Sequence, residues 1–503
     1  MDEINIFNYY FSTISRESYH RGMIFSYLEG VYSMYTFLGC LALLIIGFLI
    51  YGKFVDSVFK PTDEPTPAVR INDGVDYIPL PTWKVFMIQL LNIAGLGPIF
   101  GALGGALWGP SVYLWIVFGT IFAGGVHDYM SGMISLRENG SSISEVVGKY
   151  LGNIMLQVMR LFSVVLLVLV GTVFMTGPAN LLAMLTGMDN LFWLAVVFIY
   201  YFLATLLPID TLIARFYPLF GACLLIMAFG IGAAMLMGVG GHTMPELTLT
   251  NLHPKELPIW PLMFITVACG AVSGFHSTQS PLMARCLKSE RLARPVFYGA
   301  MVAEGIIALV WAAAGVTFYD STGGLMQAMA DVGQNKAVYE ICVGFMGTTG
   351  AVLAMLGVIA CPVTSGDTAF RSARLTLADW LGMDQANKIK RLYLSIPLLA
   401  IGGLLSQIDF TIIWRYFAWT NQTLAMIVLW TGAVYMYRNF KGKMYYLVAA
   451  IPATFMSVVT TTYILQAKEG LQLSTSISYP AGFIFAAIFL FLFLRVTVMR
   501  KEA

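Results

Sequence analysis

Apolar runs of membrane-spanning length recur along the whole chain, and they constrain its fold more than any other feature. A transmembrane helix needs about 20 mostly apolar residues, because the hydrocarbon core of a bilayer is about 30 Å thick. Charged residues make up only 11% of the chain, against about 25% in soluble domains. The sequence therefore predicts an all-α polytopic membrane protein of about thirteen transmembrane helices. The predicted spans are 33–51, 86–107, 112–136, 156–176, 190–207, 217–239, 258–280, 295–320, 338–362, 391–406, 409–435, 444–466 and 480–498.

Loops rich in lysine and arginine alternate with loops that nearly lack them. Loop 281–294 carries Arg285, Lys288, Arg291 and Arg294, whereas loop 177–189 carries no basic residue. Because cytoplasmic loops of membrane proteins are enriched in lysine and arginine, this alternation predicts the orientation. We expect a multi-pass protein of the inner (plasma) membrane with its N-terminus outside and its C-terminus in the cytoplasm.

Two polar segments fall between the spans. Segment 61–82 is rich in proline and polar residues, which indicates a linker after the first span. Segment 366–382 alternates apolar and polar residues at helical spacing, and it is too short and too charged to span. We expect it to form an amphipathic helix on the cytoplasmic face.

Two of the predicted spans carry residues that interrupt helices. "LLNIAGLGPIFGALGG" at 90–105 is rich in glycine and contains a proline, and "CGAVSGFHSTQSP" at 269–281 is rich in polar residues. A helix in lipid must satisfy its own backbone groups, so breaks are tolerated only where protein or a water-filled cavity covers them. The two breaks lie five spans apart and in opposite orientation, which is typical of an inverted-repeat transporter. The pattern predicts a five-plus-five inverted-repeat core with two discontinuous helices.

This pattern divides the chain into four parts. Residues 1–85 hold one extra transmembrane helix and the linker, and 86–240 form the first five-helix repeat. Residues 258–435 form the second, inverted repeat, and 444–503 hold two C-terminal transmembrane helices.

The broken ends of helices predict where a substrate binds, because free N–H groups attract carboxylates and free C=O groups attract cations. Gly101, Gly104 and Gly105 are instead expected to permit close helix packing. Two amides in the middle of the span 409–435 complete the candidate site, either by contacting substrate or by bonding to neighbouring helices. The candidate substrate residues are Gly95, Leu96, Gly97, Ser273, Gly274, His276, Ser277, Gln279, Asn421 and Gln422.

Ionisable residues within the spans are candidates for proton coupling, because placing them in a membrane is costly. Glu304 is the most deeply placed acid, about 14 Å into its span at 1.5 Å per residue. His127 and Asp128 lie in the span 112–136 and are candidates for a gate or proton relay. Adjacent helical residues point about 100° apart, so we expect each of these two to have its own partner. A purely structural hydrogen-bonding role is the alternative for all three, and for His276 and Gln279.

Several long segments resemble the signature segments of the carbon starvation protein A (CstA) family. These are "NIAGLGPIFGALGGALWGP", "GGVHDYMSGMISLRENG", "GAVSGFHSTQSPLMARC", "CPVTSGDTAFRSARL" and "WRYFAWTNQTLA". The resemblance covers about residues 86 to 435, and the chain is similar to a shorter member. It implies a membrane transporter induced on nutrient limitation, for which peptide uptake and pyruvate uptake by proton symport have both been proposed. It also implies distant kinship with the amino acid–polyamine–cation superfamily.

The superfamily resemblance further implies a sodium site between the first break and the eighth core helix, where serine and threonine oxygens lie. In this chain Thr364 and Ser365 lie there, at the end of the predicted span 338–362, and Asp367 and Thr368 beside them offer further hard oxygen ligands. Capping of the following amphipathic helix by Ser365 or Asp367 is the alternative. Arg415 lies nearer the outer end of its span and could attract an anionic substrate or extend to the membrane interface.

These observations together predict a secondary transporter that imports a small carboxylated nutrient, either pyruvate or a short peptide or amino acid, by cation symport, with alternating access around breaks at 95–98 and 273–280. Proton coupling is the first expectation; a sodium-coupled symporter and a channel for small solutes are the alternatives. The sequence lacks a nucleophile elbow, a phosphate-binding loop and paired histidine ligands, so we do not expect an enzyme. We expect no cofactor other than H⁺ or Na⁺ as the coupling ion, and no partners other than substrate and the lipid bilayer, with no nucleic acid. The oligomeric state is not predicted.

Overall fold

A computed structural model describes residues 34–497 apart from 75, 207–208, 384–387 and 441–442. The described residues form helices and loops without a β-strand. Labels with η denote π- or 3₁₀-helical turns. The elements of the first half are α2 Tyr35–Phe59, α3 Pro67–Arg70, α4 Thr82–Ile93, η1 Gly97–Gly101, α5 Ala102–Ala106, α6 Ser111–Gly119, η2 Thr120–Gly124, α7 Gly125–Arg137, α8 Ile143–Leu151, α9 Asn153–Thr186, α10 Asn190–Leu206, α11 Ile209–Leu236 and η3 Val239–Gly241. Those of the second half are α12 Leu262–Thr266, α13 Gly274–Ala284, η4 Glu290–Leu292, η5 Arg294–Tyr298, α14 Gly299–Phe318, α15 Thr322–Asp331, α16 Gly333–Ala354, η6 Met355–Ala360, α17 Cys361–Leu381, α18 Lys388–Leu405, α19 Phe410–Asn439, η7 Met444–Tyr446, α20 Leu447–Gln466 and α21 Thr475–Thr497.

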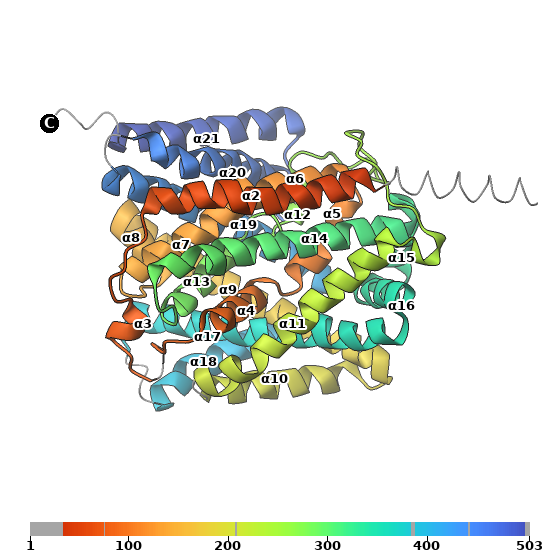
Figure 1. The fold of residues 1–503 in the computed structure, drawn as a ribbon, viewed down its shortest axis with the longest axis horizontal. Helices are drawn as coiled ribbons and strands as arrows, with labels where there is room; N and C mark the ends of the chain where they lie inside the picture. Colours follow the sequence, from red (N-terminus) through yellow and green to blue (C-terminus); the bar gives the residue numbers. More distant parts are fainter. Residues whose placement is uncertain (1–33, 75, 207–208, 384–387, 441–442, 498–503) are drawn as a thin grey trace, which may run out of the picture.

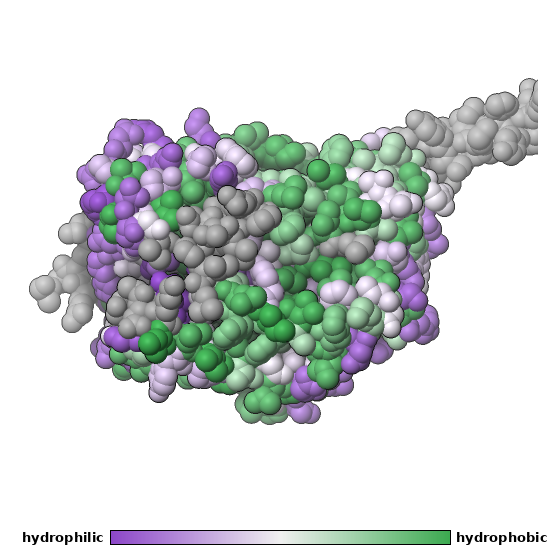
Figure 2. Space-filling model, turned by 90° about the horizontal axis from the view of Figure 1, so that it is seen from below, coloured by the Kyte–Doolittle hydropathy of each residue, from purple (hydrophilic) through white to green (hydrophobic). Residues whose placement is uncertain are grey.

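The helices form one bundle in which the broken helices lie inside. α2 and α21 run along one side of the bundle, α10 and α18 run along the opposite side, and α4, α13 and α14 lie between them (Figure 1). Apolar side chains cover the middle of one face, and hydrophilic side chains gather toward both ends (Figure 2). This distribution is that of an integral membrane protein, since an apolar belt faces lipid and polar ends face water.

Helices of membrane-spanning character are found where the sequence predicts them. Among the described residues, 6 helices are long and apolar enough to span by themselves, or up to 8 if each of two bent pairs counts as one span. Each predicted apolar run overlaps at least one described helix. The all-helical membrane fold is therefore confirmed, and the number of thirteen spans stays a prediction.

The predicted linker is hydrogen-bonded to the rest of the protein at several residues. The hydroxyl of Thr66 donates to the carbonyl of Leu287 at 2.6 Å, and the N–H of Leu80 donates to the carbonyl of Cys286 at 3.1 Å. Segment 61–82 therefore packs against the loop after α13, at the end of the bundle where lysine- and arginine-rich loops meet. Thr66 is buried by this contact, whereas other polar residues of the segment, such as Asp63 and Glu64, stay exposed to water.

The first break lies where glycine and proline predict it. α4 ends at Ile93, and the following η1 and α5 are bent by 53° from it. The glycines after the break pack closely on the second broken helix: a Cβ at Gly105 would lie 2.2 Å from Cγ2 of Val267, and one at Gly104 would lie 3.0 Å from Cγ2 of Thr266. This agrees with the expected packing role of Gly101, Gly104 and Gly105.

The second break lies before the position that the polar residues suggest. α12 ends at Thr266 and α13 begins at Gly274, so the break covers 267–273, and its Gly270 has a φ of 91°. The predicted break at 273–280 is wrong for residues 274–280. The reason is that hydroxyls in this stretch satisfy themselves within the helix: Ser277 donates to the carbonyl of Gly274 at 2.7 Å, and Thr278 donates to that of Phe275 at 2.6 Å.

The expected surface helix at 366–382 is instead the buried helix α17, packed against α9. A Cβ at Gly171 of α9 would lie 2.3 Å from the ring of Phe370. Arg371 and Arg374 are buried, and their guanidinium groups donate to the carbonyls of Ala204 at 3.0 Å and Thr205 at 3.4 Å. These carbonyls belong to the last turn of α10, so the two positive charges lie at the C-terminal end of a helix, which carries a partial negative charge. This is why a charged segment lies inside.

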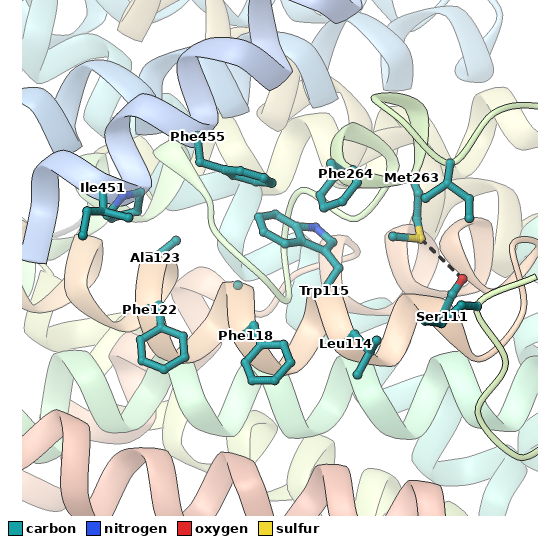
Figure 3. Close-up of a pocket in the computed structure, with 14 residues that line it drawn as sticks. Ser111, Leu114, Trp115, Phe118, Phe122, Ala123, Met263, Phe264, Ile451 and Phe455 are labelled. Carbon is teal, nitrogen blue, oxygen red and sulfur yellow. Dashed lines mark hydrogen bonds between the residues drawn. The ribbon is translucent and has the colours of Figure 1, made fainter. Parts of the chain in front are cut away.

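An apolar groove of about 470 Å³ opens on the bundle between α6, η2, α12 and α20. The indole of Trp115 contacts the rings of Phe264 and Phe455, whose centroids lie 4.9 Å and 5.6 Å from it (Figure 3). The described residues that line this groove include no charged side chain.

Candidate functional site

The two breaks lie side by side at the centre of the bundle. A Cβ at Gly97 would lie 2.2 Å from Cβ of Cys269, and one at Gly270 would lie 3.7 Å from Cα of Pro98. The breaks approach this closely because glycine leaves the space a side chain would fill. Of the predicted substrate residues, Gly97 is thus next to the second break, whereas Gly95 and the side chain of Leu96 pack against α9.

Side chains from neighbouring helices satisfy the carbonyls that the second break frees. The hydroxyl of Thr120 donates to the carbonyl of Gly270 at 2.9 Å, and the indole N–H of Trp115 donates to that of Val267 at 3.2 Å. Backbone polar groups inside a membrane must be satisfied in this way, so the break is a built feature of the fold.

Asn421 of α19 holds the start of α13. Its Oδ1 accepts from the backbone N–H of Phe275 at 2.7 Å and from the hydroxyl of Ser273 at 3.1 Å. The amide of Gln422 donates to the carbonyl of Phe264 at 3.3 Å, before the break. The predicted pair Asn421 and Gln422 therefore binds both sides of the second break, and Ser273 and Gly274 lie at the same junction.

Asp128 of α7 joins two buried histidines. Its carboxylate lies 2.8 Å from Nδ1 of His127 and 2.8 Å from Nδ1 of His276, which belongs to α13. All three side chains have 0% exposure. The expectation that His127 and Asp128 are not paired is wrong: their Cβ atoms diverge, but the carboxylate and the near ring nitrogen still reach each other.

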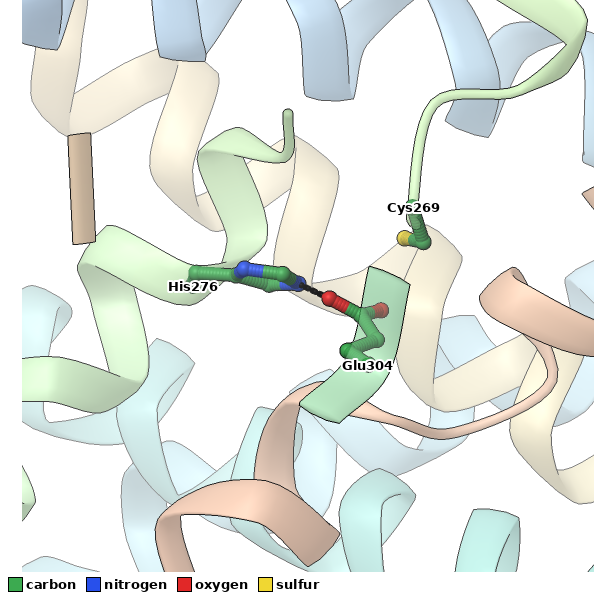
Figure 4. Close-up of side chains that lie close together, drawn as sticks. All are labelled: Cys269, His276 and Glu304. Atoms are coloured by element: carbon green, nitrogen blue, oxygen red, sulfur yellow. Dashed lines mark ion pairs between the residues drawn. The ribbon is translucent and has the colours of Figure 1, made fainter. Parts of the chain in front are cut away.

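The same network continues to Glu304 of α14. Nε2 of His276 lies 3.3 Å from Oε2 of Glu304, and both side chains have 0% exposure (Figure 4). The thiol of Cys269 completes the group, and the polar atoms of Cys269, His276 and Glu304 all lie within 4.8 Å of one another. The structure therefore brings together three elements, α7, α13 and α14, through four ionisable residues and a thiol.

The hydrogen-bond geometry determines what this network does chemically. A carboxylate only accepts, so both histidines present N–H at Nδ1 to Asp128. Nε2 of His276 then presents a lone pair toward Oε2 of Glu304 at an ion-pair distance of 3.3 Å, and neither atom makes a hydrogen bond to the described residues. A proton on either atom lies within reach of the other, so His276 and Glu304 are placed to exchange it.

A second group of oxygens lies between the first break and α17. The hydroxyl of Ser365 donates to the carbonyl of Leu91 at 2.7 Å, and the thiol of Cys361 lies 3.2 Å from the carbonyl of Ala94. The hydroxyl of Thr364 donates to the carbonyl of Cys361 at 2.7 Å. Hydroxyl and carbonyl oxygens are hard ligands, so this group is chemically suited to an alkali cation.

Asp367 does not join these oxygens. Its carboxylate accepts from the hydroxyl of Tyr217 in α11 at 3.3 Å. The alternative of helix capping by Ser365 or Asp367 is wrong, because α17 begins earlier, at Cys361, without a side-chain cap.

Of the remaining predicted residues, Ser277 and Gln279 lie near the same centre, whereas Arg415 does not. Ser277 is buried within α13, and the amide of Gln279 donates to the hydroxyl of Ser372 in α17 at 3.3 Å. Arg415 lies apart and pairs with Glu469 at 3.3 Å. Cys269, which is not among the predicted site residues, belongs to the central group. Its position directly before Gly270 was the one feature of the sequence that could have placed Cys269 at the second break.

Comparison with known proteins places the chain among membrane transporters. Residues 32–186 and 177–343 match the family model described as Carbon starvation protein CstA. An uncharacterized membrane protein of Haemophilus influenzae is 43% identical over 350 residues, covering 59% of this chain and 94% of that protein. The peptide transporter CstA of Bacillus subtilis is 27% identical over 84% of this chain and 88% of its own length. The pyruvate/proton symporter BtsT of Escherichia coli is 26% identical over 56% of this chain and 49% of its own length.

Two solved structures share the fold at low sequence identity. MhsT, in complex with L-phenylalanine, is 14% identical, with 81% of this chain and 97% of that chain covered and a TM-score of 0.52. Mhp1, a nucleobase-cation-symport-1 family transporter in a closed conformation, is 14% identical, with 84% and 94% covered and a TM-score of 0.50.

Proposed function

Because the chain belongs to the carbon starvation protein CstA family, we propose that it is a secondary transporter that imports a small carboxylated nutrient together with a proton. Its core is two five-helix repeats related by inversion, each beginning with an interrupted helix, α4–α5 and α12–α13. The relatives named peptide transporter and pyruvate/proton symporter support transport and leave pyruvate, short peptides and amino acids as candidate substrates. Alternating access operates around the two adjacent breaks.

The buried network of Asp128, His276 and Glu304 is the observation that carries proton coupling. With Asp128 ionised, both histidines neutral and one proton shared by His276 and Glu304, the network holds one net negative charge. Such a charge is costly in a site with 0% exposure. One additional proton removes the charge, so the network is suited to load a proton.

The same charge balance links the proton to the substrate. A substrate carboxylate at the breaks brings a second negative charge next to the network, and the two charges repel strongly in a low dielectric. Loading a proton relieves this repulsion. Proton and carboxylate therefore favour each other's binding, which is the thermodynamic requirement for symport. His127 extends the network from Asp128 by one imidazole, whose Nε2 makes no hydrogen bond to the described residues.

Sodium coupling is the second candidate, and the oxygens around Thr364 and Ser365 favour it. The carbonyls of Leu91 and Ala94 and the hydroxyls of α17 would supply the ligands, and Asp367 would contribute charge from nearby. Ser365→Ala removes one ligand. If sodium is the coupling ion, this variant loses sodium-driven uptake; if the proton is, the variant still accumulates substrate under a proton gradient.

Transport by purified protein in proteoliposomes tests the proposal. Labelled pyruvate, alanine and di-alanine are offered under an imposed proton gradient, an imposed sodium gradient, or none. Accumulation of one of them above its equilibrium level under the proton gradient is the expected result. Equilibration without accumulation would indicate a channel, and absence of uptake of all three under every gradient would contradict the proposal.

Orientation in the membrane belongs to the same proposal. We place the end that carries α3, α8 and the loop 281–294 in the cytoplasm, because the lysine- and arginine-rich loops meet there. The protein then lies in the inner membrane with its C-terminus inside. Accessibility of cysteines introduced at exposed positions of this end, measured in intact cells, tests this orientation.

A further inference from the structure

A second groove, larger than the one in Figure 3, opens between the core and the two C-terminal helices. It has a volume of about 950 Å³ and lies between the start of α9, one face of α19, and α20 and α21. Cavities that hold ligands of drug size have about 300–1,000 Å³, so this groove has room for a sizeable molecule. None of the residues of the proposed transport site lines it.

The walls of this groove are apolar and aromatic along most of its length. Trp419 and Trp430 of α19 face it from the core, and Phe485 of α21, which is 43% exposed, faces it from the other side. The lining residues of α19 run from Trp419 to Arg438, about 28 Å at 1.5 Å per residue. A long flexible hydrocarbon chain fits an apolar groove of this length.

One end of the groove is basic. Lys149 of α8 and Arg438 of α19 line it there. Lys149 is paired with Glu138 at 2.5 Å, whereas Arg438 lies over the ring of Tyr150 and has no carboxylate within ion-pair distance among the described residues. Arg438 therefore supplies the uncompensated positive charge at this end.

The basic end lies on the side of the bundle where the lysine- and arginine-rich loops meet. The guanidinium of Arg438 donates to the carbonyl of Tyr150, at the end of α8, at 3.2 Å. In the loop before α8, the carbonyl of Gly140 accepts a hydrogen bond from Arg285 at 2.9 Å. In the proposed orientation this side faces the cytoplasmic leaflet. Basic pockets at that level bind the head groups of anionic lipids.

We propose that this groove binds an anionic phospholipid from the surrounding bilayer, with its phosphate at Arg438 and an acyl chain along Trp419, Trp430 and Phe485. Arg438 forms the charge-assisted hydrogen bonds to the phosphate, while Lys149 stays paired with Glu138 beside it. The lipid fills the space between the transport core and α20–α21, and so couples these helices to the core.

Lipid retention in native mass spectrometry tests the proposal independently of transport. The purified full chain is mixed with palmitoyl-oleoyl phosphatidylglycerol or with phosphatidylcholine of the same acyl chains, and the bound lipid is counted. A basic side chain near the membrane surface contributes about 1 kcal/mol to binding of anionic lipid, which corresponds to about fivefold. We expect the wild type to prefer phosphatidylglycerol by at least that factor.

Three variants locate the site. Arg438→Gln is expected to lose about fivefold of the preference for phosphatidylglycerol. Arg294→Gln is the matched control, because Arg294 lies over the ring of Phe48 at the same end of the bundle but lines neither groove; it is expected to keep the preference. Ala481→Trp fills the groove and is expected to lose retention of the lipid.

The outcomes that overturn the proposal are distinct. Equal retention of both lipids by the wild type would show that no anionic site exists. An unchanged preference in Arg438→Gln or Ala481→Trp would place the lipid elsewhere, and an equal loss in Arg294→Gln would indicate attraction to surface charge alone. None of these results bears on the proton-coupled transport proposed above.

Discussion

Gly97→Ala is expected to separate the two breaks and to impair transport. A Cβ at position 97 would lie 2.2 Å from Cβ of Cys269 and 2.5 Å from its Sγ. Carbon atoms pack at about 3.5–4.0 Å, so the breaks must move apart by about 1.5 Å. Overpacking of this kind costs about 1–3 kcal/mol. We expect a lower free energy of unfolding in detergent and a loss of most gradient-driven uptake in proteoliposomes.

Two further variants show whether the contact itself is responsible. Gly104→Ala is the matched control in the same segment, because its Cβ would lie 3.0 Å from Thr266 Cγ2, a distance that a small side-chain shift relieves. It is expected to change stability and uptake much less. Cys269→Gly removes the opposing Cβ, so the double variant with Gly97→Ala is expected to regain stability relative to Gly97→Ala alone. A Gly97→Ala protein with wild-type stability and wild-type uptake would refute the close approach of the two breaks.

Other variants test the groups around this centre. Asp128→Asn replaces one acceptor oxygen by an N–H donor that faces an imidazole N–H, so one histidine loses the carboxylate that orients its ring. Loss of a hydrogen bond to a charged group costs about 1.5–3 kcal/mol, so uptake is expected to fall about 10- to 100-fold. An unchanged uptake rate would show that Asp128 does not orient the histidines for transport. Asn421→Ala leaves the N–H of Phe275 without its acceptor and is expected to lower the free energy of unfolding by about 1–3 kcal/mol, measured by chemical denaturation in detergent. Asn421→Asp keeps an acceptor oxygen and is its matched comparison: an equal loss in both variants would mean that the acceptor is not what matters.

The membrane class and the first break could be predicted from the sequence because local chemistry determines them. Long apolar runs need no tertiary information, and Pro98 removes a backbone donor wherever it is placed in a helix. Gly97 and Gly105 were also predictable as positions of weak helix or close packing. The atoms that these two glycines face could not be predicted, because Cys269 and Val267 approach them only after the second broken helix has packed against the first.

The errors have a common physical cause, which is that polar side chains had partners the sequence does not reveal. Ser277 and Thr278 looked like a broken stretch, but their hydroxyls bond to carbonyls of their own helix. Arg371 and Arg374 looked like the exposed face of a surface helix, but the carbonyls that end α10 receive them in the interior. His127 and Asp128 were expected to point apart, and side-chain reach brings them to 2.8 Å. Glu304 was recognisable as a buried acid, whereas its contact with His276 depends on how α13 and α14 pack.

Proton movement through Glu304 can be followed together with substrate transport in the same vesicles. Wild-type and Glu304→Gln proteins are reconstituted with an internal pH-sensitive dye, and substrate entry and acidification are recorded together. Glutamine keeps the shape of the side chain and a hydrogen-bonding group toward His276 but carries no exchangeable acid proton. We expect substrate-dependent acidification in the wild type, and in Glu304→Gln we expect substrate exchange without acidification or uphill accumulation. Substrate-coupled acidification of wild-type size in Glu304→Gln would contradict the account.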